Sequence, residues 1–221
     1  MRAFPDYPPW TPMLIITIKQ GKEKSLLDRQ PWIYASAIER IDGKAHERMK
    51  SGATVLVRSS SGKFLARAGW SPLSQIRARV WTFDENEAVD HALIKRRVKA
   101  AVAARTAARK NAAAPLLLVA GEDDGLPGLR VDWVGGARGT LVCQFQAAGV
   151  DAWKVPIVQA LMAETGCPNV FELSDELVRK AEGLSASNGA LAGDAPPDSV
   201  LAAIDLGPPR AVKDGKGGGR S

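Results

Sequence analysis

The chain has 221 residues, of which 45% are apolar, a share that is ordinary for a globular protein and excludes wholesale disorder. Its net charge of +6 is unevenly distributed, because residues 1–110 hold 21 basic and 10 acidic side chains whereas residues 111–221 hold 9 and 14. The basic front half predicts an anionic partner, and nucleic acid is the first candidate.

The cysteine content and the hydropathy pattern exclude further classes of protein. Cys143 and Cys167 alone cannot form a disulfide framework or a zinc site, and they fit a reducing compartment. The longest apolar run, 112–120, contains Pro115 and is far shorter than the roughly 20 residues that a membrane span needs. We therefore expect a cytoplasmic protein without a membrane segment or a metal site.

Residues 1–83 predict a leader followed by mainly β structure. The segment 1–12 contains four prolines and predicts a Pro-rich leader, with Met13 as the natural start. In residues 13–83, one short helix is expected at 22–29, before Pro31. The strand-like runs, rich in β-branched residues or alternating in polarity, are 14–18, 54–57, 64–70 and 76–82. Several short strands at close spacing predict a small barrel.

Residues 84–112 predict a linker helix. Ile94, Val98 and Val102 repeat at helical spacing, and Thr82 with Glu85 forms a possible capping box. Acidic residues precede basic ones along this segment, an order that suits the helix dipole. Part of the basic excess is therefore equally explained by a solvated helix face.

Residues 113–184 predict a small mixed α+β domain, and residues 185–221 predict a disordered tail. A helix is expected at 150–164, and the tail ends in a Gly-rich stretch without aromatic residues. The expected strands of this domain are 116–119, 129–133, 141–145 and 170–173. The predicted fold class is thus mainly β and α+β, with the barrel first.

One predicted strand carries a candidate RNA-binding face. Alternation over 76–82 places Arg77, Arg79 and Trp81 on one side, where two guanidiniums could grip phosphates beside an indole that stacks on a base. The alternative is that Trp81 lies in the core and the arginines pair with acids of the following helix. The other candidate RNA contacts are Lys22, Lys24, Arg29, Arg67 and Trp70.

Two other groups of residues do not indicate a catalytic or metal site. Cys143 and Cys167 have no neighbouring His or Lys in the sequence to lower their pKa, and we interpret them as buried or incidental thiols. The acidic segment 122–124 lies in a Gly-flanked turn whose spacing matches no calcium-binding loop, so we interpret it as solvated. No catalytic residue is predicted in this chain.

Four ordered motifs resemble one family. They are 21–27 with 31–38, then 64–82, then 118–129, and finally Ser174-Asp175 with 178–184. Together they are similar to the bacterial 23S rRNA cytosine-C5 methyltransferases. The resemblance implies an RNA-binding PUA domain, a central domain, and a third, Rossmann-like domain that binds S-adenosylmethionine and carries the catalytic cysteine.

The resemblance covers residues 14–195 and stops after about Pro197. No strand followed by a Gly-rich turn that could hold the cofactor is evident, so no cofactor is expected in this chain, although the family uses S-adenosylmethionine. The resulting expectation is an RNA-binding portion of such a methyltransferase that binds large-subunit rRNA and does not methylate by itself.

Several alternatives stay open at this point. The chain could be a stand-alone PUA-type RNA-binding protein, a protein–protein adaptor that uses its acidic second half, or a truncated or frameshifted product without a role of its own. A separate chain could also supply the catalytic domain. The sequence does not predict an oligomeric state.

Overall fold

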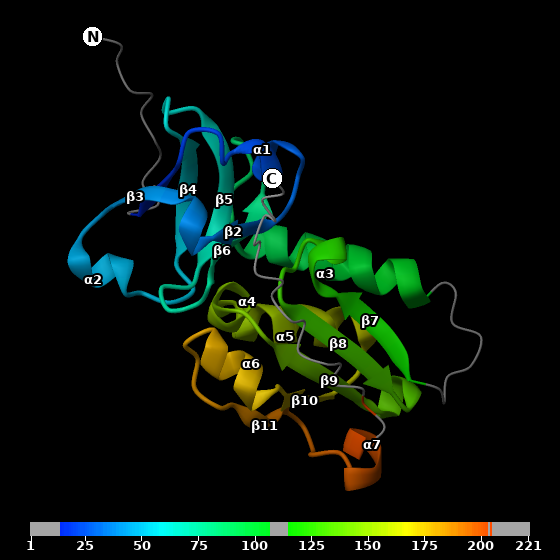
Figure 1. The fold of residues 1–221 in the computed structure, drawn as a ribbon. Helices are drawn as coiled ribbons and strands as arrows, with labels where there is room; N and C mark the ends of the chain where they lie inside the picture. The colour runs from blue at the N-terminus through cyan, green and yellow to red at the C-terminus, as the bar shows by residue number, and fades with distance from the viewer. Residues whose placement is uncertain (1–13, 107–114, 203, 205–221) are drawn as a thin grey trace, which may run out of the picture.

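The computed structural model describes residues 14–106, 115–202 and 204, and its strands form two sheets (Figure 1). The first sheet has the order β2-β6-β5-β4-β1-β3 and curls into a half-barrel. Its neighbouring strands are antiparallel except for β1 and β4, which are parallel. The strands are β1 (Ile15–Ile18), β2 (Trp32–Tyr34), β3 (Ile38–Asp42), β4 (Thr54–Ser59), β5 (Phe64–Trp70) and β6 (Ile76–Thr82).

The interior of the half-barrel is filled by aliphatic side chains. Ile16, Val55, Val57, Ala66 and Ala78 are fully buried there, as expected for strands that turn alternate residues inward. Two short helices, α1 (Lys24–Leu27) and α2 (Ala45–Arg48), and the 3₁₀ turn η1 (Ala35–Ala37) connect the strands. The small barrel predicted for this part of the chain is confirmed as a curled sheet, and β2, β3 and α2 are additional to the predicted elements.

Helix α3 (His91–Thr106) follows the half-barrel and begins later than the helix predicted over 84–112. Its start is fixed by Asp90, whose carboxylate accepts a hydrogen bond from the backbone N–H of Leu93 at 2.9 Å. Thr82 instead accepts from the N–H of Asp84 at 3.0 Å, so it stabilises a turn and not the predicted capping box with Glu85. Residues 107–112 lie outside the described residues.

The second sheet has the order β11-β10-β9-β8-β7. Its strands β9 and β10 are parallel and are joined by the helices α4 and α5, whereas the other neighbouring pairs are antiparallel. The elements are β7 (Leu116–Ala120), η2 (Gly121–Asp124), β8 (Leu129–Val134), η3 (Gly136–Arg138), β9 (Thr140–Phe145), α4 (Ala148–Ala152), α5 (Lys154–Thr165), β10 (Asn169–Leu173), α6 (Glu176–Ala181) and β11 (Asn188–Ala192).

Helices α3 and α5 pack against each other and share a core with the second sheet (Figure 1). Ile94 and Val98 of α3 and Leu161 of α5 are fully buried together with Leu118 and Phe145 of the sheet. The helical spacing of Ile94 and Val98 therefore marks a packed face, as the sequence predicted. The predicted linker helix belongs to the core of the second sheet.

The disordered tail predicted from residue 185 onward is wrong for the part that the structure describes. Strand β11 pairs with β10, and the short helix α7 (Asp198–Ala202) follows it. Side-chain amides reinforce this edge of the sheet, because Asn188 accepts from the Ser174 N–H at 2.7 Å and Asn169 accepts from the Asp194 N–H at 3.0 Å. The Pro-rich leader 1–12, Met13, and residues 203 and 205–221 lie outside the described residues.

Two further predictions can be compared with the part of the chain that is described. Over 14–106, 115–202 and 204, no helix is long and apolar enough to cross a membrane. Over the same ranges, no group of three His, Cys, Asp or Glu side chains is placed to hold a metal ion.

Candidate nucleic-acid interface

The face of β6 that carries Arg77, Arg79 and Trp81 is covered by the domain built on the second sheet. Trp81 is only 3% exposed, and a Cβ added at Gly149 of α4 would lie 3.3 Å from its indole ring. The guanidinium of Arg77 donates to the backbone carbonyl of Pro72. The alternation along β6 was predicted correctly, but the prediction of an exposed stacking platform is wrong because this face lies between the two domains.

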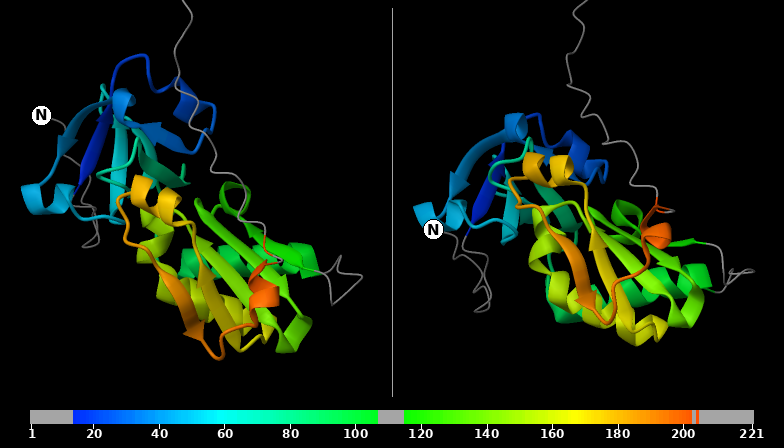
Figure 2. Two further views of the ribbon diagram at one scale, coloured as in Figure 1. Left: turned by 60° about the horizontal axis from the view of Figure 1, so that its bottom comes forward. Right: turned by 90° about the horizontal axis from the view of Figure 1, so that it is seen from below.

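Arg79 forms a two-pronged ion pair with Glu182, which lies directly after α6. Its Nη1 is 2.7 Å from Oε2 and its Nη2 is 2.8 Å from Oε1, and both side chains are largely buried. The hydroxyls of Ser71 and Ser74 donate to the same carboxylate at 3.1 and 2.8 Å. Figure 2 shows α6 beside the half-barrel in both views. Arg79 therefore joins two domains, and its partner is not an acid of the following helix.

The acidic turn after β7 also contacts the half-barrel. The carboxylate of Glu122 accepts a hydrogen bond from the indole N–H of Trp32 at 3.0 Å and lies 4.0 Å from Nε of Arg79. Asp124 pairs with Arg105 of α3 at 2.9 Å. The interpretation as a solvated turn is therefore wrong for Glu122 and Asp124, whereas Asp123 is exposed.

Arg67 and Trp70 of β5 are buried as well. The indole N–H of Trp70 donates to the backbone carbonyl of Arg48 at 2.7 Å, and the guanidinium of Arg67 donates to the carbonyl of Glu85 at 3.0 Å. Trp70 is 2% exposed and Arg67 is 8% exposed. Neither side chain is available to a phosphate or a base, so the structure does not support their prediction as RNA contacts.

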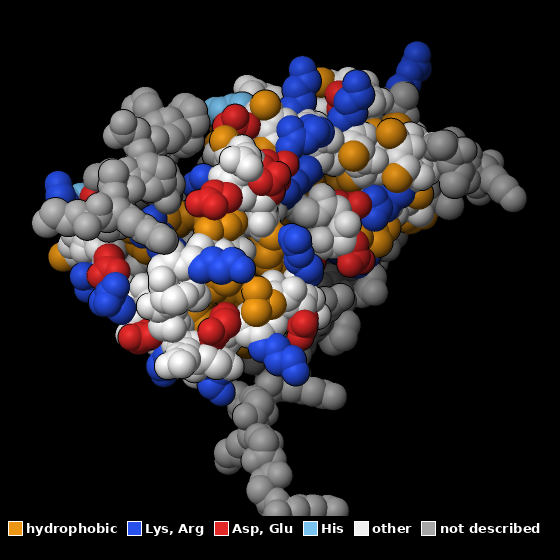
Figure 3. All heavy atoms as spheres, turned by 90° about the horizontal axis from the view of Figure 1, so that it is seen from above, with side chains coloured by type: hydrophobic (Ala, Val, Ile, Leu, Met, Phe, Trp, Pro, Cys, Tyr) orange, Lys and Arg blue, Asp and Glu red, His pale blue; other side chains and the backbone are white. Residues whose placement is uncertain are grey.

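The three remaining candidates, Lys22, Lys24 and Arg29, are exposed and lie in and around α1. The guanidinium of Arg29 lies 5.0 Å from the ring centroid of Phe83, in a cation–π contact that fixes its position. Lys19 is exposed beside them and was missed by the sequence analysis. Figure 3 shows the surface seen from above, where Lys and Arg side chains are interspersed with a smaller number of acidic ones.

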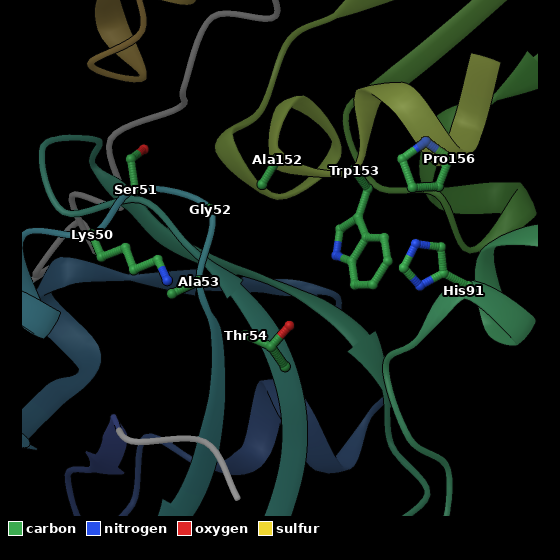
Figure 4. Close-up of a pocket in the computed structure, with 9 residues that line it drawn as sticks. All are labelled: Lys50, Ser51, Gly52, Ala53, Thr54, His91, Ala152, Trp153 and Pro156. Carbon is green, nitrogen blue, oxygen red and sulfur yellow. The ribbon is translucent and has the colours of Figure 1, made fainter. Parts of the chain in front are cut away.

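A groove of about 370 Å³ lies where the half-barrel meets α3, α4 and α5 (Figure 4). Its aromatic wall is formed by Trp153, between α4 and α5, and by His91, the first residue of α3. Their ring centroids are 5.1 Å apart in an edge-to-face arrangement. The opposite wall consists of the segment that joins α2 to β4, which contributes Lys50, and of the first residue of β4, Thr54. The sequence analysis missed this site because its walls come from segments about a hundred residues apart.

A network of charged groups is buried at the ends of β9 and β10. Glu172 is fully buried and pairs with Lys154 at 2.8 Å and with Arg179 at 3.4 Å. Arg179 also donates to the carbonyl of Phe145 at 2.8 Å and pairs with Asp151 at 2.9 Å. Each buried charge therefore faces an opposite one, which offsets part of the cost of removing it from water.

Both cysteines are buried free thiols, as predicted. Burial raises the pKa of the Cys143 thiol strongly, and the nearby carboxylates of Glu172 and Asp132 raise it further. The Sγ of Cys167 donates to the backbone carbonyl of Gly139 at 3.2 Å. A thiol with a raised pKa is a poor nucleophile, which agrees with the interpretation that Cys143 has no catalytic role.

Comparison with known families identifies residues 16–83 as a PUA-like domain, which corresponds to the half-barrel. The similarity to curated proteins extends over most of the chain. A protein of Aliivibrio fischeri (strain ATCC 700601 / ES114) is 43% identical over 187 residues, and one of Cronobacter sakazakii is 41% identical over 204 residues. Both are named "Ribosomal RNA large subunit methyltransferase I".

These alignments cover 84% and 92% of this chain but 46% and 49% of the relatives. The chain thus spans about half the length of the curated relatives that it matches. Among solved structures, a candidate SAM-dependent methyltransferase from Streptococcus mutans superposes with a TM-score of 0.64 at 12% identity. The superposition covers 84% of this chain and 44% of the Streptococcus mutans chain. This likeness shows a shared fold. A second candidate methyltransferase, solved in complex with SAH, gives the same TM-score.

The described residues do not fit S-adenosylmethionine at the place where such a cofactor would be expected. Nucleotide cofactors of α/β folds bind at the turn between a strand and the next helix, beyond the carboxyl ends of parallel strands. In the parallel pair β9 and β10, this turn leads into α4, which packs against β5 of the half-barrel. A Cβ added at Gly69 of β5 would lie only 2.9 Å from Cα of Gly149. From the other side, a Cβ at Gly128 would lie 2.4 Å from Cβ of Ala147.

Proposed function

We propose that this chain is the RNA-recognition portion of a SAM-dependent 23S rRNA (cytosine-C5) methyltransferase and that it acts in the cytoplasm on large-subunit rRNA. The observation that carries the proposal is the identity of about 40%, over more than four-fifths of the chain, with proteins named "Ribosomal RNA large subunit methyltransferase I". The PUA-like domain at residues 16–83 supports RNA as the partner. We further propose that this domain, the α3 segment and the α+β domain act as one unit on the RNA.

The α1 surface is the proposed contact with the phosphate backbone. Lys22, Lys24 and Arg29 are exposed, and Lys19 extends the same surface. Lysine and arginine side chains that neutralise phosphates release counterions, which makes the affinity depend on salt concentration. Arg67, Arg77 and Arg79, which are buried or half-buried and bonded within the protein, are assigned to structure and not to this contact.

We propose that the described part of the chain binds RNA without transferring a methyl group. Helix α4, which follows β9, packs closely against β5, and the thiol of Cys143 lies inside the sheet with a raised pKa. When bound, S-adenosylmethionine would supply the methyl group, and these residues offer it no place. The cytosine-C5 specificity rests on the resemblance of the four sequence motifs.

The α1 surface is tested by removing two of its lysines. Binding of a fluorescently labelled 23S rRNA transcript to the wild type and to the Lys22→Ala, Lys24→Ala double variant is measured over a series of salt concentrations. We expect weaker binding, and a logarithmic salt slope that is smaller by about one unit for each lost phosphate contact.

The matched control removes the same charge elsewhere. Lys95 and Lys99 are exposed lysines on α3, and the Lys95→Ala, Lys99→Ala variant is expected to keep the wild-type salt slope. If the α1 variant and the control lose the same affinity, the α1 surface is not the contact. If the wild-type chain itself does not bind the transcript, the proposed function is wrong.

A further inference from the structure

We infer that the groove between the half-barrel and the helices α3 to α5 binds one unstacked nucleotide of a single-stranded RNA segment. The inference rests on the proposed function, because it gives that RNA a second contact, separate from the α1 surface. In this inference, Trp153 and His91 contact the base, and Lys50 contacts the phosphate.

The composition of the groove fits a nucleotide. None of the nine residues that line it carries a carboxylate, so no lining group repels a phosphate. Its volume of about 370 Å³ falls in the range of sites for small ligands, about 300–1,000 Å³. The hydroxyls of Ser51 and Thr54 supply donors and acceptors that a base or a ribose can use.

The aromatic wall offers a stacking surface. Figure 4 shows the indole of Trp153 and the imidazole of His91 projecting into the same space, opposite the segment from Lys50 to Thr54. The two rings are nearly perpendicular, at 79°, so a base stacked on one ring meets the edge of the other. Proteins that bind single-stranded nucleic acid use such aromatic faces together with a basic track along the backbone.

A basic track leads to this groove along the segment around α2. Lys44, Arg48 and Lys50 are exposed, and no described residue forms an ion pair with them. The acid within this segment, Glu47, is buried and accepts a hydrogen bond from the N–H of Lys44 at 2.9 Å. The carboxylate nearest to His91 in the sequence, that of Asp90, is engaged as the cap of α3.

The backbone around the groove is held in place by close packing. Gly52 has φ +80°, and a Cβ there would lie 2.5 Å from Cβ of Ala152 and 2.6 Å from the carbonyl oxygen of Ala148. The N–H of Gly52 donates to the carbonyl of Trp70 at 2.8 Å. The wall that carries Lys50 is therefore fixed against the helix that precedes Trp153, so the two walls keep their spacing before RNA arrives.

The test uses the full chain and a ten-nucleotide oligouridylate that carries one 5-iodouridine and a fluorescent label. Trp153→Leu removes the aromatic face and Trp153→Phe keeps one. Anisotropy titrations should show a 5- to 150-fold loss of affinity for Trp153→Leu, as expected for one stacked base, and less than about a threefold loss for Trp153→Phe. Photocrosslinking of the wild type should attach the iodouridine to a peptide that contains Trp153 or His91.

A charge control separates the groove from general attraction. Lys50→Ala should lower the logarithmic salt slope by about one unit, whereas Lys63→Ala, an exposed lysine at the opposite end of β4, should leave it unchanged. Circular dichroism melting curves confirm that each variant is folded. If Trp153→Leu and Lys50→Ala bind like the wild type, or if the crosslink maps elsewhere, the inference is overturned.

The outcomes also separate this inference from the proposed function. If the Lys22→Ala, Lys24→Ala variant loses affinity while the groove variants do not, the RNA-binding function stands and the groove assignment is wrong. If the wild-type chain binds neither the oligouridylate nor the 23S rRNA transcript, the proposed function fails together with the groove.

Discussion

At the scale of single residues, Arg79 and Glu182 form an ion pair that links the two domains. The guanidinium and the carboxylate meet through two parallel hydrogen bonds, and two serine hydroxyls of the half-barrel complete the coordination of the carboxylate. A largely buried ion pair of this geometry specifies how two surfaces fit, because removal of one partner leaves the other charge buried and unpaired.

We expect Glu182→Gln to lower the free energy of unfolding by about 3 kcal/mol, because Arg79 loses the nearer of its two opposite charges at a largely buried position and keeps only Glu122 at 4.0 Å. Urea denaturation followed by tryptophan fluorescence measures this change. The matched control is Glu176→Gln, which makes the same substitution at an exposed position of α6 and is expected to be close to neutral. Equal stability of the two variants would contradict the structural role of Glu182.

Sequence alone could assign Arg79 to a face but not to a partner. The alternation over 76–82 is a local property, and it correctly separated Ala78 and Val80 from Arg77 and Arg79. The side chain that covers Arg79 lies 103 residues further along the chain, and no local pattern encodes such a contact. The same reason explains why Trp81 was predicted on an exposed face: its neighbour Gly149 lies in a different domain.

At the scale of elements, the start of α3 shows how capping competes with charge pattern. Both Glu85 and Asp90 are acidic residues that suit a helix start, and the sequence favoured the earlier one. In the structure, residues 84–90 are not helical and contain one turn at 84–87, and the carboxylate of Asp90 caps the helix through the N–H of Leu93. The apolar spacing that begins at Ile94 was the reliable part of the prediction, because it reflects burial.

Asp90→Ala is expected to lower the free energy of unfolding by about 1 kcal/mol, since the first turn of α3 loses its side-chain cap. Thermal or urea denaturation measures the change. Glu85→Ala, at the position that the sequence favoured, serves as the comparison and should change stability by less than about 0.5 kcal/mol. A larger loss for Glu85→Ala than for Asp90→Ala would place the helix start where the sequence put it.

Most strands were predictable from the sequence, and the exceptions share a cause. Strands β5 and β6 both have the predicted bounds, and β6 alternates between polar and apolar residues over most of its length. Strand β2 has strand-favouring residues but only three of them, too few for a pattern, and β11 consists of Asn, Gly, Ala and Leu, which do not favour strands. Both are formed by pairing with a neighbour, β6 and β10 respectively, which a single sequence does not reveal.

At the scale of the whole molecule, the two domains pack closely against each other. The contacts of Glu182 and Glu122 with the half-barrel, and the close approach of Gly69 and Gly149, hold the PUA-like domain against the α+β domain. The structure shows which basic side chains of the first half of the chain are paired and which are exposed. Arg79 of the basic half is paired with carboxylates inside the junction, whereas the lysines of α1 and of the segment around α2 remain exposed.

The proposed function is that this chain binds large-subunit rRNA and does not methylate it. The most direct measurement incubates the purified chain with unmodified 23S rRNA and tritiated S-adenosylmethionine, and records bound RNA and transferred label in the same samples. We expect salt-dependent binding of the rRNA. We also expect no tritium label in the RNA above the level of a sample without protein. Stoichiometric transfer of the label to cytosine, or the absence of RNA binding, would contradict it.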